Sequence, residues 1–374
     1  MKQLIYADNA ATTKLDKEAF ETMVPWLTDE YGNASQPYAF SRKPKKALAE
    51  ARETIAKCIN AFPEEIYFTS GGTESDNWAI KGSAFLDPDK RAMITSAIEH
   101  HAILQSCVAI ERLGYPVAYL TPNKYGVITP DNLVRIITDQ TRLVSIMFSN
   151  NEIGTVEPIK ELAEVSHRHG SLFHTDAVQA IGHVKIDVQE LGIDMLSASA
   201  HKFNGPKGVG FLYIRNGIDL ASLNDGGSQE KSRRAGTENI AGIVGMATAL
   251  DTNCNHIEEN EKHIISLEHE FLTGIQTLDF IRNGDENHIP GNISLSFKNA
   301  DGEAILHRMD LMGICISTGS ACDSVNTHIS HVIKSIGVPE EYAAGTIRIS
   351  LSKDNTIEEI KAIASALIRI LGRN

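Results

Sequence analysis

The sequence predicts an α/β fold in which a mostly parallel sheet is covered by helices on both faces. From residue 66 onward, short apolar segments alternate with segments of helical periodicity, which is typical of such a sheet. The chain has 374 residues, more than one hydrophobic core usually serves, so two domains are expected. No G-x-G-x-x-G motif follows the first expected strands, which disfavours a dinucleotide-binding fold.

Residues 66–214 supply the expected sheet, and helices are expected before it. Residues 5–7 are predicted to form a short strand or arm, Asp16 to cap a helix running to about Leu27, and residues 45–59 to form an amphipathic helix. The strands expected in the sheet are residues 66–68, 91–95, 117–120, 143–148, 172–175, 195–197 and 209–214. The helices expected between them include residues 102–113, 130–137 and 159–169.

The last third of the chain is expected to form a smaller α+β domain. Residues 240–250 are predicted to be a helix, and residues 253–260 the polar start of a longer one. The elements expected after them are strands at 292–297, 314–317 and 346–350 and helices at 302–312 and 356–371. We therefore predict a large domain at 14–252 and a small domain formed by 1–13 and 253–374.

Composition argues against several kinds of partner and location for this protein. A formal net charge of −13 argues against a nucleic-acid or anionic-membrane partner. No apolar run approaches membrane-spanning length, and the first residues lack a signal-peptide pattern. The five cysteines are widely spaced and contain no C-x-x-C pair, which favours a reducing cytoplasm over a disulfide scaffold.

The stretch from Ser197 to Lys202 contains the first candidate for chemistry. It places a lysine among small residues between two apolar runs, where lysine is seldom found unpaired. A desolvated lysine amine loses its charge easily and becomes a nucleophile toward carbonyl groups. The alternative is a solvent-exposed lysine beside the turn at Gly205-Pro206.

Two further stretches favour the chemical interpretation. Residues 172–175 form an apolar strand followed by Asp176, and a pyridoxal phosphate enzyme needs a carboxylate facing the pyridine nitrogen. Residues 66–75 run from a strand through Gly71 and Gly72 into an expected helix N-terminus, which is a ready anion site. The amine, the carboxylate and the phosphate cradle together indicate pyridoxal 5'-phosphate.

Eight motifs then give the chain a family resemblance. They are D-N-A-A-T-T at 8–13, T-S-G-G-T-E-S-D-N at 69–77, E-H-H-A at 99–102, N-N-E-I-G at 150–154, H-T-D-A-V-Q at 174–179, S-A-H-K at 199–202, R-A-G-T at 234–237 and S-T-G-S-A-C at 317–322. In these motifs and their order the chain resembles the cysteine desulfurases of the NifS/IscS type, within the aminotransferase class V group. The resemblance implies a fold type I pyridoxal phosphate-dependent transferase and no metal.

The resemblance also implies roles for individual residues. Lys202 matches the Schiff-base lysine, and Asp176 matches the partner of the pyridine nitrogen. Gln179 matches the contact to the phenolic oxygen. His100, rather than His101, matches the residue stacked on the ring, where a histidine can also act as a catalytic acid or base. The residues that match phosphate contacts are Gly72, Thr73, Ser199, His201 and, from the second subunit of a homodimer, Thr237.

The resemblance assigns substrate binding and sulfur transfer to three more residues. Asn151 and Arg348 match the contacts to the substrate carboxylate, and Asn151 is also expected to contact the cofactor. An arginine can bind a carboxylate through two parallel hydrogen bonds. A structural salt bridge is the alternative for Arg348. Cys322 lies in a Gly/Ser/Ala-rich stretch and matches the nucleophile, whereas Cys315 is expected to be a buried apolar residue.

The resemblance thus predicts a cytoplasmic, homodimeric cysteine desulfurase. It would convert L-cysteine to L-alanine and leave a persulfide on Cys322 for an acceptor protein, an iron–sulfur scaffold being one candidate. A selenocysteine lyase or transaminase of the same fold would not require Cys322. A catalytically idle binding partner would not require the intact set of Lys202, Asp176 and Cys322.

Overall fold

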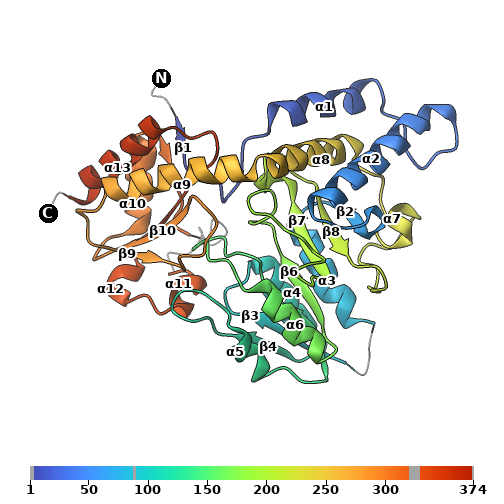
Figure 1. Cartoon of the computed structure of the whole chain (residues 1–374), viewed down its shortest axis with the longest axis horizontal. Helices are drawn as coiled ribbons and strands as arrows, with labels where there is room; N and C mark the ends of the chain where they lie inside the picture. Colours follow the sequence, from blue (N-terminus) through green and yellow to red (C-terminus); the bar gives the residue numbers. More distant parts are fainter. Residues whose placement is uncertain (1–3, 87–89, 320–328, 373–374) are drawn as a thin grey trace.

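The computed structural model describes residues 4–86, 90–319 and 329–372, and its centre is a seven-stranded sheet (Figure 1). The strands, in spatial order, are β2 (Ile66–Thr69), β8 (Gly210–Ile214), β7 (Met195–Ser199), β6 (Leu172–Asp176), β5 (Thr141–Ser145), β3 (Ala92–Ser96) and β4 (Val117–Leu120). Strand β8 runs antiparallel to both of its neighbours, and the other pairs are parallel. The predicted α/β fold is therefore confirmed.

Helices surround this sheet. They include α2 (Arg42–Cys58), α3 (Gly72–Ala84), α4 (His101–Glu111), α5 (Pro130–Val134), α6 (Ile159–Arg168) and α8 (Ile240–Asn255), and α1 (Lys17–Thr28) packs against α8. The predicted cap at Asp16 is confirmed, since its carboxylate accepts the backbone N–H groups of Glu18 and Ala19. Helix α2 begins three residues earlier than expected because Pro44 lies in its first turn, where proline is tolerated.

Three predicted boundaries need correction. The strand expected at 143–148 is shifted to Thr141–Ser145, although the N–H groups of Ile146 and Phe148 still bond to carbonyls of β6. The helix expected at 130–137 ends at Val134. The longer helix does not begin at 253, because buried Asn253 belongs to α8 and donates to the Phe203 carbonyl; α9 (Ile257–Gly274) follows.

The end of the chain forms a second layered unit beside α9 (Figure 1). Its antiparallel sheet has the order β12 (Thr346–Ser350), β10 (Asn292–Phe297) and β9 (Phe280–Asn283), and β9 was not predicted. A parallel pair joins β1 (Ile5–Tyr6) to β11 (Ile314–Cys315). The helices of this part are α10 (Gly302–Leu311), α11 (His331–Ser335), α12 (Glu340–Ala343) and α13 (Ile357–Leu371).

Side-chain alternation in β12 connects this unit to the site described below. Ile347 and Ile349 are fully buried in an apolar cluster with residues of α9 and α13. Because successive side chains of a strand point to opposite faces, Arg348 points the other way. Within the described residues, we find no helix that is both long and apolar enough to span a bilayer.

Candidate active site

A cavity of about 290 Å³ lies at the carboxyl ends of β6 and β7 and the N-terminus of α3. Ten of the predicted site residues line it: Gly72, Thr73, His100, Asn151, Asp176, Gln179, Ser199, His201, Lys202 and Arg348. Ala10 and Ala11 of the N-terminal segment also line it. Thr237 lies elsewhere, on an exposed loop, and Cys322 lies outside the described residues.

Lys202 ends a 3₁₀ turn, Ala200–Lys202, that directly follows β7. Its ammonium group donates hydrogen bonds to the carbonyl oxygens of Ala10 and Ala11. The N-terminal segment is itself held to this turn, since the Thr13 hydroxyl donates to the His201 carbonyl at 2.9 Å. The lysine is therefore oriented inside the cavity, and the alternative of a solvent-exposed loop lysine is wrong.

Asp176 is the last residue of β6, and it is only 5 % exposed. Burial raises the pKa of its carboxyl group, while the nearby His100 and Lys202 and a hydrogen bond from the Val178 N–H oppose that rise. These opposing contacts favour the ionised form. The residue thus places a buried carboxylate at the cavity wall.

His100 caps the N-terminus of α4. Its Nδ1 atom accepts the Ala102 N–H at 3.2 Å, so the proton of the neutral ring lies on Nε2. Burial lowers the pKa of His100, which keeps the ring neutral near pH 7. His101 is not among the residues lining the cavity; its ring lies 5.1 Å from that of His331.

Asp76 also lines the cavity, but the sequence analysis assigned it no role. It is fully buried, and the ligand atoms of Asp76, His100 and Asp176 lie within 4.8 Å of one another. Burial, followed by the charge of Asp176, holds the pKa of Asp76 well above its usual range. Of the two carboxyl groups, Asp76 is therefore the one that keeps a proton. Its position inside the T-E-S-D-N motif, on the helix turn after Thr73, was the available signal.

The N-terminus of α3 lines the cavity through Gly72 and Thr73 and forms a cradle of backbone N–H groups there. Gly71 has a φ of 147°, a conformation that favours glycine, and a Cβ atom on Gly72 would lie 2.6 Å from a methyl group of Val178. The unpaired N–H groups of a helix N-terminus attract anions. Ser199 and His201 line the same cavity, and burial lowers the pKa of His201 to about 4.

Arg348 reaches the cavity from β12, with its side chain 2 % exposed. Its two terminal nitrogens donate to the Asn151 carbonyl and to Asp8 Oδ1, each at 2.8 Å. The salt bridge considered for this residue is therefore present. Its Nε atom is buried and has no hydrogen-bond partner among the described residues, and each terminal nitrogen carries a second N–H, so the guanidinium keeps donors for an anionic ligand.

Two further positions differ from the sequence-based expectation or refine it. Cys315 is only partly buried, because it lies in the short, two-residue strand β11, so the prediction of a buried apolar residue is wrong. Gln179 donates its amide to the Ala10 carbonyl at 3.0 Å, which ties the N-terminal segment to the cavity wall.

Comparisons with known proteins agree with this site. The model of the aminotransferase class-V family matches residues 5–363. The chain is 45% identical to the cysteine desulfurase IscS of Methanosarcina thermophila, over 98% of this chain and 92% of the relative. It is 46% identical to the cysteine desulfurase IscS of Dictyoglomus turgidum, over 99% and 95%.

Solved structures give the same result. A NifS-like protein superposes with a TM-score of 0.94 at 36% identity and covers 99% of this chain and 100% of its own. The structure described as SspA in complex with cysteine has a TM-score of 0.84 at 37% identity, with 95% and 100% covered. The chain therefore belongs to the aminotransferase class-V family and, within it, to the cysteine desulfurases of the NifS/IscS type. Enzymes of this family depend on pyridoxal phosphate, and this chain is one of them.

The residues of the cavity fit that cofactor. The helix N-terminus at Gly72 and Thr73 faces the cavity and suits a phosphate group, and the buried Asp176 carboxylate suits a protonated ring nitrogen. Lys202 supplies the amine, and neutral His100 offers a flat ring at the same cavity.

Proposed function

We propose that this protein acts as a homodimer in the cytoplasm and removes sulfur from L-cysteine. The products are L-alanine and a persulfide on Cys322, whose outer sulfur passes to an acceptor protein. The observation that carries this proposal is the single cavity in which Lys202, Asp176 and Arg348 meet. Relatives that are 45–46% identical over nearly the whole chain bear the name cysteine desulfurase.

The cofactor would be held at three points. The N-terminus of α3 with Thr73, Ser199 and His201 would bind the phosphate, Asp176 would keep a proton on the ring nitrogen, and Gln179 would contact the phenolic oxygen. When bound, pyridoxal phosphate supplies a conjugated ring that takes up the electron pair released from the substrate's Cα–H bond.

The substrate carboxylate would bind to Arg348. Its guanidinium group is fixed by Asp8 and by the Asn151 carbonyl, and its buried Nε–H is directed to no other described group. An ion pair formed in such a buried place is strong and directional. Asn151 holds Arg348 through its backbone and lines the cavity beside it. This contact orients the amino acid with its Cα toward the Lys202 amine.

Lys202 would then move the proton of the substrate's Cα. The carbonyl groups of Ala10 and Ala11 accept hydrogen bonds from its nitrogen and so hold it in one orientation. His100, kept neutral by burial, carries its proton on Nε2 and can pass it on at the same cavity.

Cys322 would take the sulfur. Its thiolate attacks the substrate sulfur, an S–S bond forms as the C–S bond breaks, and the electron pair stays with the three-carbon fragment that becomes alanine. The described residues on either side reach the site: the backbone of Ser317 pairs with that of Arg348, and His331 Nε2 lies 3.1 Å from the carbonyl of Glu99, which precedes His100.

Some features of the proposal rest on the family resemblance. They are the homodimer, in which Thr237 would contact the cofactor phosphate of the partner subunit, the cytoplasmic location and the acceptor protein. The division into a large domain, residues 14–252, and a small domain, residues 1–13 together with 253–374, is a further one. Two apolar clusters, one around the main sheet and one between α9, α13 and β10, support that division.

The test is formation of L-alanine from L-cysteine by the holoenzyme, with dithiothreitol present to release sulfur. We expect one alanine for each sulfide released, and no turnover by Cys322→Ser although that variant retains the cofactor. Alanine formation from cysteine by Cys322→Ser at the wild-type rate would overturn the assignment of the nucleophile. Efficient transamination of cysteine, without sulfide, would indicate the alternative activity of the same fold.

A further inference from the structure

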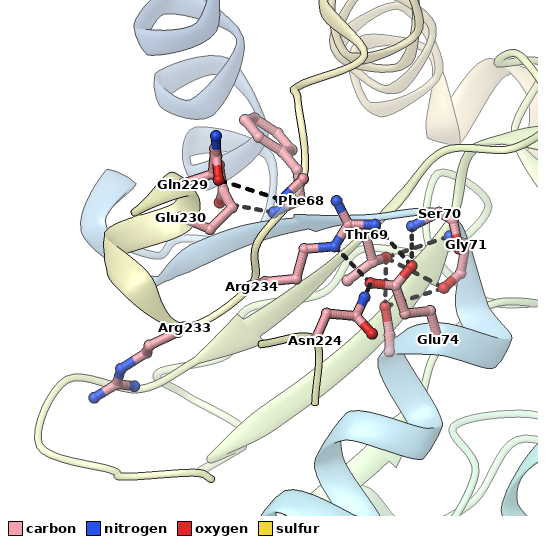
Figure 2. Close-up of polar contacts among 12 residues, drawn as sticks. Phe68, Thr69, Ser70, Gly71, Glu74, Asn224, Gln229, Glu230, Arg233 and Arg234 are labelled. Atoms are coloured by element: carbon pink, nitrogen blue, oxygen red, sulfur yellow. Dashed lines mark hydrogen bonds and ion pairs between the residues drawn. The ribbon is translucent and has the colours of Figure 1, made fainter. Parts of the chain in front are cut away.

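The loop formed by residues 224–237, which leads to Thr237, is fastened to the strand and helix that build the phosphate cradle (Figure 2). We propose that Glu74 and Arg234 are positioning residues whose ion pair ties this loop to the cradle, so that each subunit's cradle holds the Thr237 that serves its partner. The inference rests on the proposed function, in which Thr237 contacts the cofactor phosphate of the partner subunit.

The ion pair between Glu74 and Arg234 is bidentate. Arg234 Nε lies 2.7 Å from Glu74 Oε1, and the second nitrogen, Nη2, lies 3.0 Å from Oε2. The side chains are 20% and 12% exposed, so water screens the pair only partly. Burial alone would raise the pKa of Glu74, but the hydrogen bonds from Arg234 and Ser70 lower it, so the carboxylate is charged near pH 7.

Glu74 also belongs to the cradle. It lies in the first turn of α3, beside Thr73, and its Oε2 atom accepts the Ser70 N–H at 2.8 Å. Ser70 precedes Gly71 and Gly72, whose backbone forms the cradle. One carboxylate therefore bridges the turn that would hold a phosphate and the loop that ends at Thr237.

A second ion pair holds the start of the same loop. Glu230 binds Arg52 through both oxygens, at 2.7 and 2.9 Å, and accepts the Phe68 N–H at 3.0 Å. Three consecutive residues, Glu230 to Ser232, have φ values of 44°, 58° and 63°. Non-glycine residues keep this conformation only where surrounding contacts enforce it. The loop thus has a defined shape imposed by β2 and α2.

Backbone hydrogen bonds hold the two residues between Arg234 and Thr237. The Ala235 N–H bonds to the Asn224 carbonyl, and the Gly236 N–H donates to the side chain of Gln229. Thr237 follows, is exposed, and is not among the residues lining the cavity of its own subunit. An exposed hydroxyl on a rigidly held loop is suited to contact a second copy of the chain.

Arg233 provides a matched control. It is adjacent to Arg234 and also forms an ion pair, with Asp219 at 2.8 Å, but Figure 2 shows its side chain directed away from Glu74. Replacing either arginine with glutamine removes one positive charge from the same loop. Only the change at 234 removes the ion pair with Glu74.

The first experiment measures the affinity of the apoprotein dimer for pyridoxal phosphate, from the visible absorbance of the cofactor bound to Lys202. We expect Arg234→Gln and Glu74→Gln each to weaken the affinity for pyridoxal phosphate about tenfold. The double variant should bind the cofactor as tightly as the single variant with the lower affinity, because both changes remove the same ion pair. Arg233→Gln should change affinity less than about twofold. Equal losses in Arg234→Gln and Arg233→Gln, or additive losses in the double variant, would overturn the proposal.

The second experiment separates action on the partner from a local effect. Mixed dimers contain one reporter chain and one silent chain, in which Lys202→Ala prevents the covalent link and its absorbance. We expect Arg234→Gln to weaken binding at the reporter site when it is placed on the silent chain. A loss seen only when Arg234→Gln is on the reporter chain would mean a purely local role and would overturn the proposal.

Thr237→Ala on the silent chain is the reference for both outcomes. If it leaves the reporter site unchanged, the contact across subunits fails, and with it that part of the proposed function. If it weakens the reporter site while Arg234→Gln does not, the contact stands and only the positioning role of Glu74 and Arg234 is overturned. Thermal unfolding of each variant verifies that it is folded.

Discussion

Glu74 and Asp76 lie two residues apart on α3, yet their carboxyl groups are in opposite states. Glu74, in the first turn of the helix, is charged because Arg234 and the Ser70 N–H bind it. Asp76, at the cavity, is fully buried beside Asp176, and its pKa is held well above its usual range. Glu74 is thus held charged by an ion pair, whereas Asp76 is held neutral in a wall where Asp176 is the charged carboxyl group and Lys202 and Arg348 are the cations.

The same contrast extends to the neighbouring side chains. Burial lowers the pKa of His174 to about 3 and raises the pKa of Glu99 to about 8, so both are uncharged at neutral pH. His174 lies between two hydroxyl groups, Ser145 and Ser197, at 2.8 and 2.9 Å. With these neighbours neutral, the charged groups that line the cavity are Asp176, Lys202 and Arg348.

The largest expected effect is on turnover, and it distinguishes Lys202 in the cavity from Lys231 on the loop of residues 224–237. Lys202→Ala should lower turnover by about three orders of magnitude or more, since it removes the group that moves the proton. Lys231→Ala, on the loop where Lys231 bonds to the Glu64 carbonyl, should keep turnover within about threefold. Steady-state alanine formation measures both, and comparable losses would mean that the cavity is not the reaction site.

The next largest effect compares kcat after removal of each of the two carboxyl groups of the cavity, Asp176 and Asp76. Asp176→Asn should lower kcat by about 10²–10⁴-fold, because a neutral amide cannot hold a proton on the ring nitrogen. Asp76→Asn should lower it less than about tenfold, since it replaces a carboxylic acid that is already neutral. Infrared spectra of the holoenzyme should contain a protonated-carboxyl band that Asp76→Asn removes. Loss of that band in Asp176→Asn instead would reverse the assignment.

A smaller effect is expected at the substrate contact. Arg348→Lys replaces a planar guanidinium, whose separate nitrogens donate to Asp8 and to the Asn151 carbonyl, by three donors on one atom that cannot present two parallel N–H groups to a carboxylate. We expect kcat/KM for L-cysteine to fall roughly ten- to a hundredfold, which corresponds to about 1.5–3 kcal/mol, with cofactor affinity nearly unchanged. An unchanged kcat/KM would assign substrate binding to another residue.

The smallest effects concern stability, and they should have opposite signs. The pKa of Glu99 is about 8 in the folded state and 4.5 in the unfolded state. The free energy of unfolding therefore falls as the pH rises from 4.5 to 8, because only the unfolded state releases the proton. Glu99→Gln has no proton to release at this position and does not show this fall. Its Tm should therefore exceed that of the wild type by an amount that grows across this window. A Tm difference that is independent of pH would contradict the protonation of Glu99.

Glu74→Gln should have the reverse effect. The pKa of Glu74 is lowered, so its contribution is present above the unfolded value of 4.5 and is lost as pH falls through the folded pKa. At neutral pH the variant should melt about 2–5 °C lower, and the difference should shrink in acid. An equal difference at pH 7 and at pH 3 would mean that the ion pair contributes nothing.

Much of this site could be predicted because its residues lie in short motifs at the ends of elements. The apolar strand before Asp176 and the small residues before Lys202 indicated where the sheet edge would place them. Alternation in β12 correctly turned Arg348 away from Ile347 and Ile349. Parallel strands end at one edge, so these groups were expected to meet.

What could not be predicted depends on contacts between distant segments. The pairing of Glu74 with Arg234 joins residues 160 positions apart, and nothing in either local sequence specifies it. Asp76 resembles any polar residue of a helix until the sheet buries it. The antiparallel direction of β8 and the existence of β9 follow from tertiary pairing, which periodicity does not encode.

The account is tested most directly by locating the sulfur after a single turnover. The holoenzyme is mixed with one equivalent of L-cysteine, alkylated, digested and analysed by mass spectrometry, while alanine is measured in the same sample. We predict one extra sulfur atom on the peptide that contains Cys322, in an amount equal to the alanine formed, and none in Lys202→Ala. Sulfur found instead on Cys58, Cys107, Cys254 or Cys315, or alanine formed without any persulfide, would contradict the account.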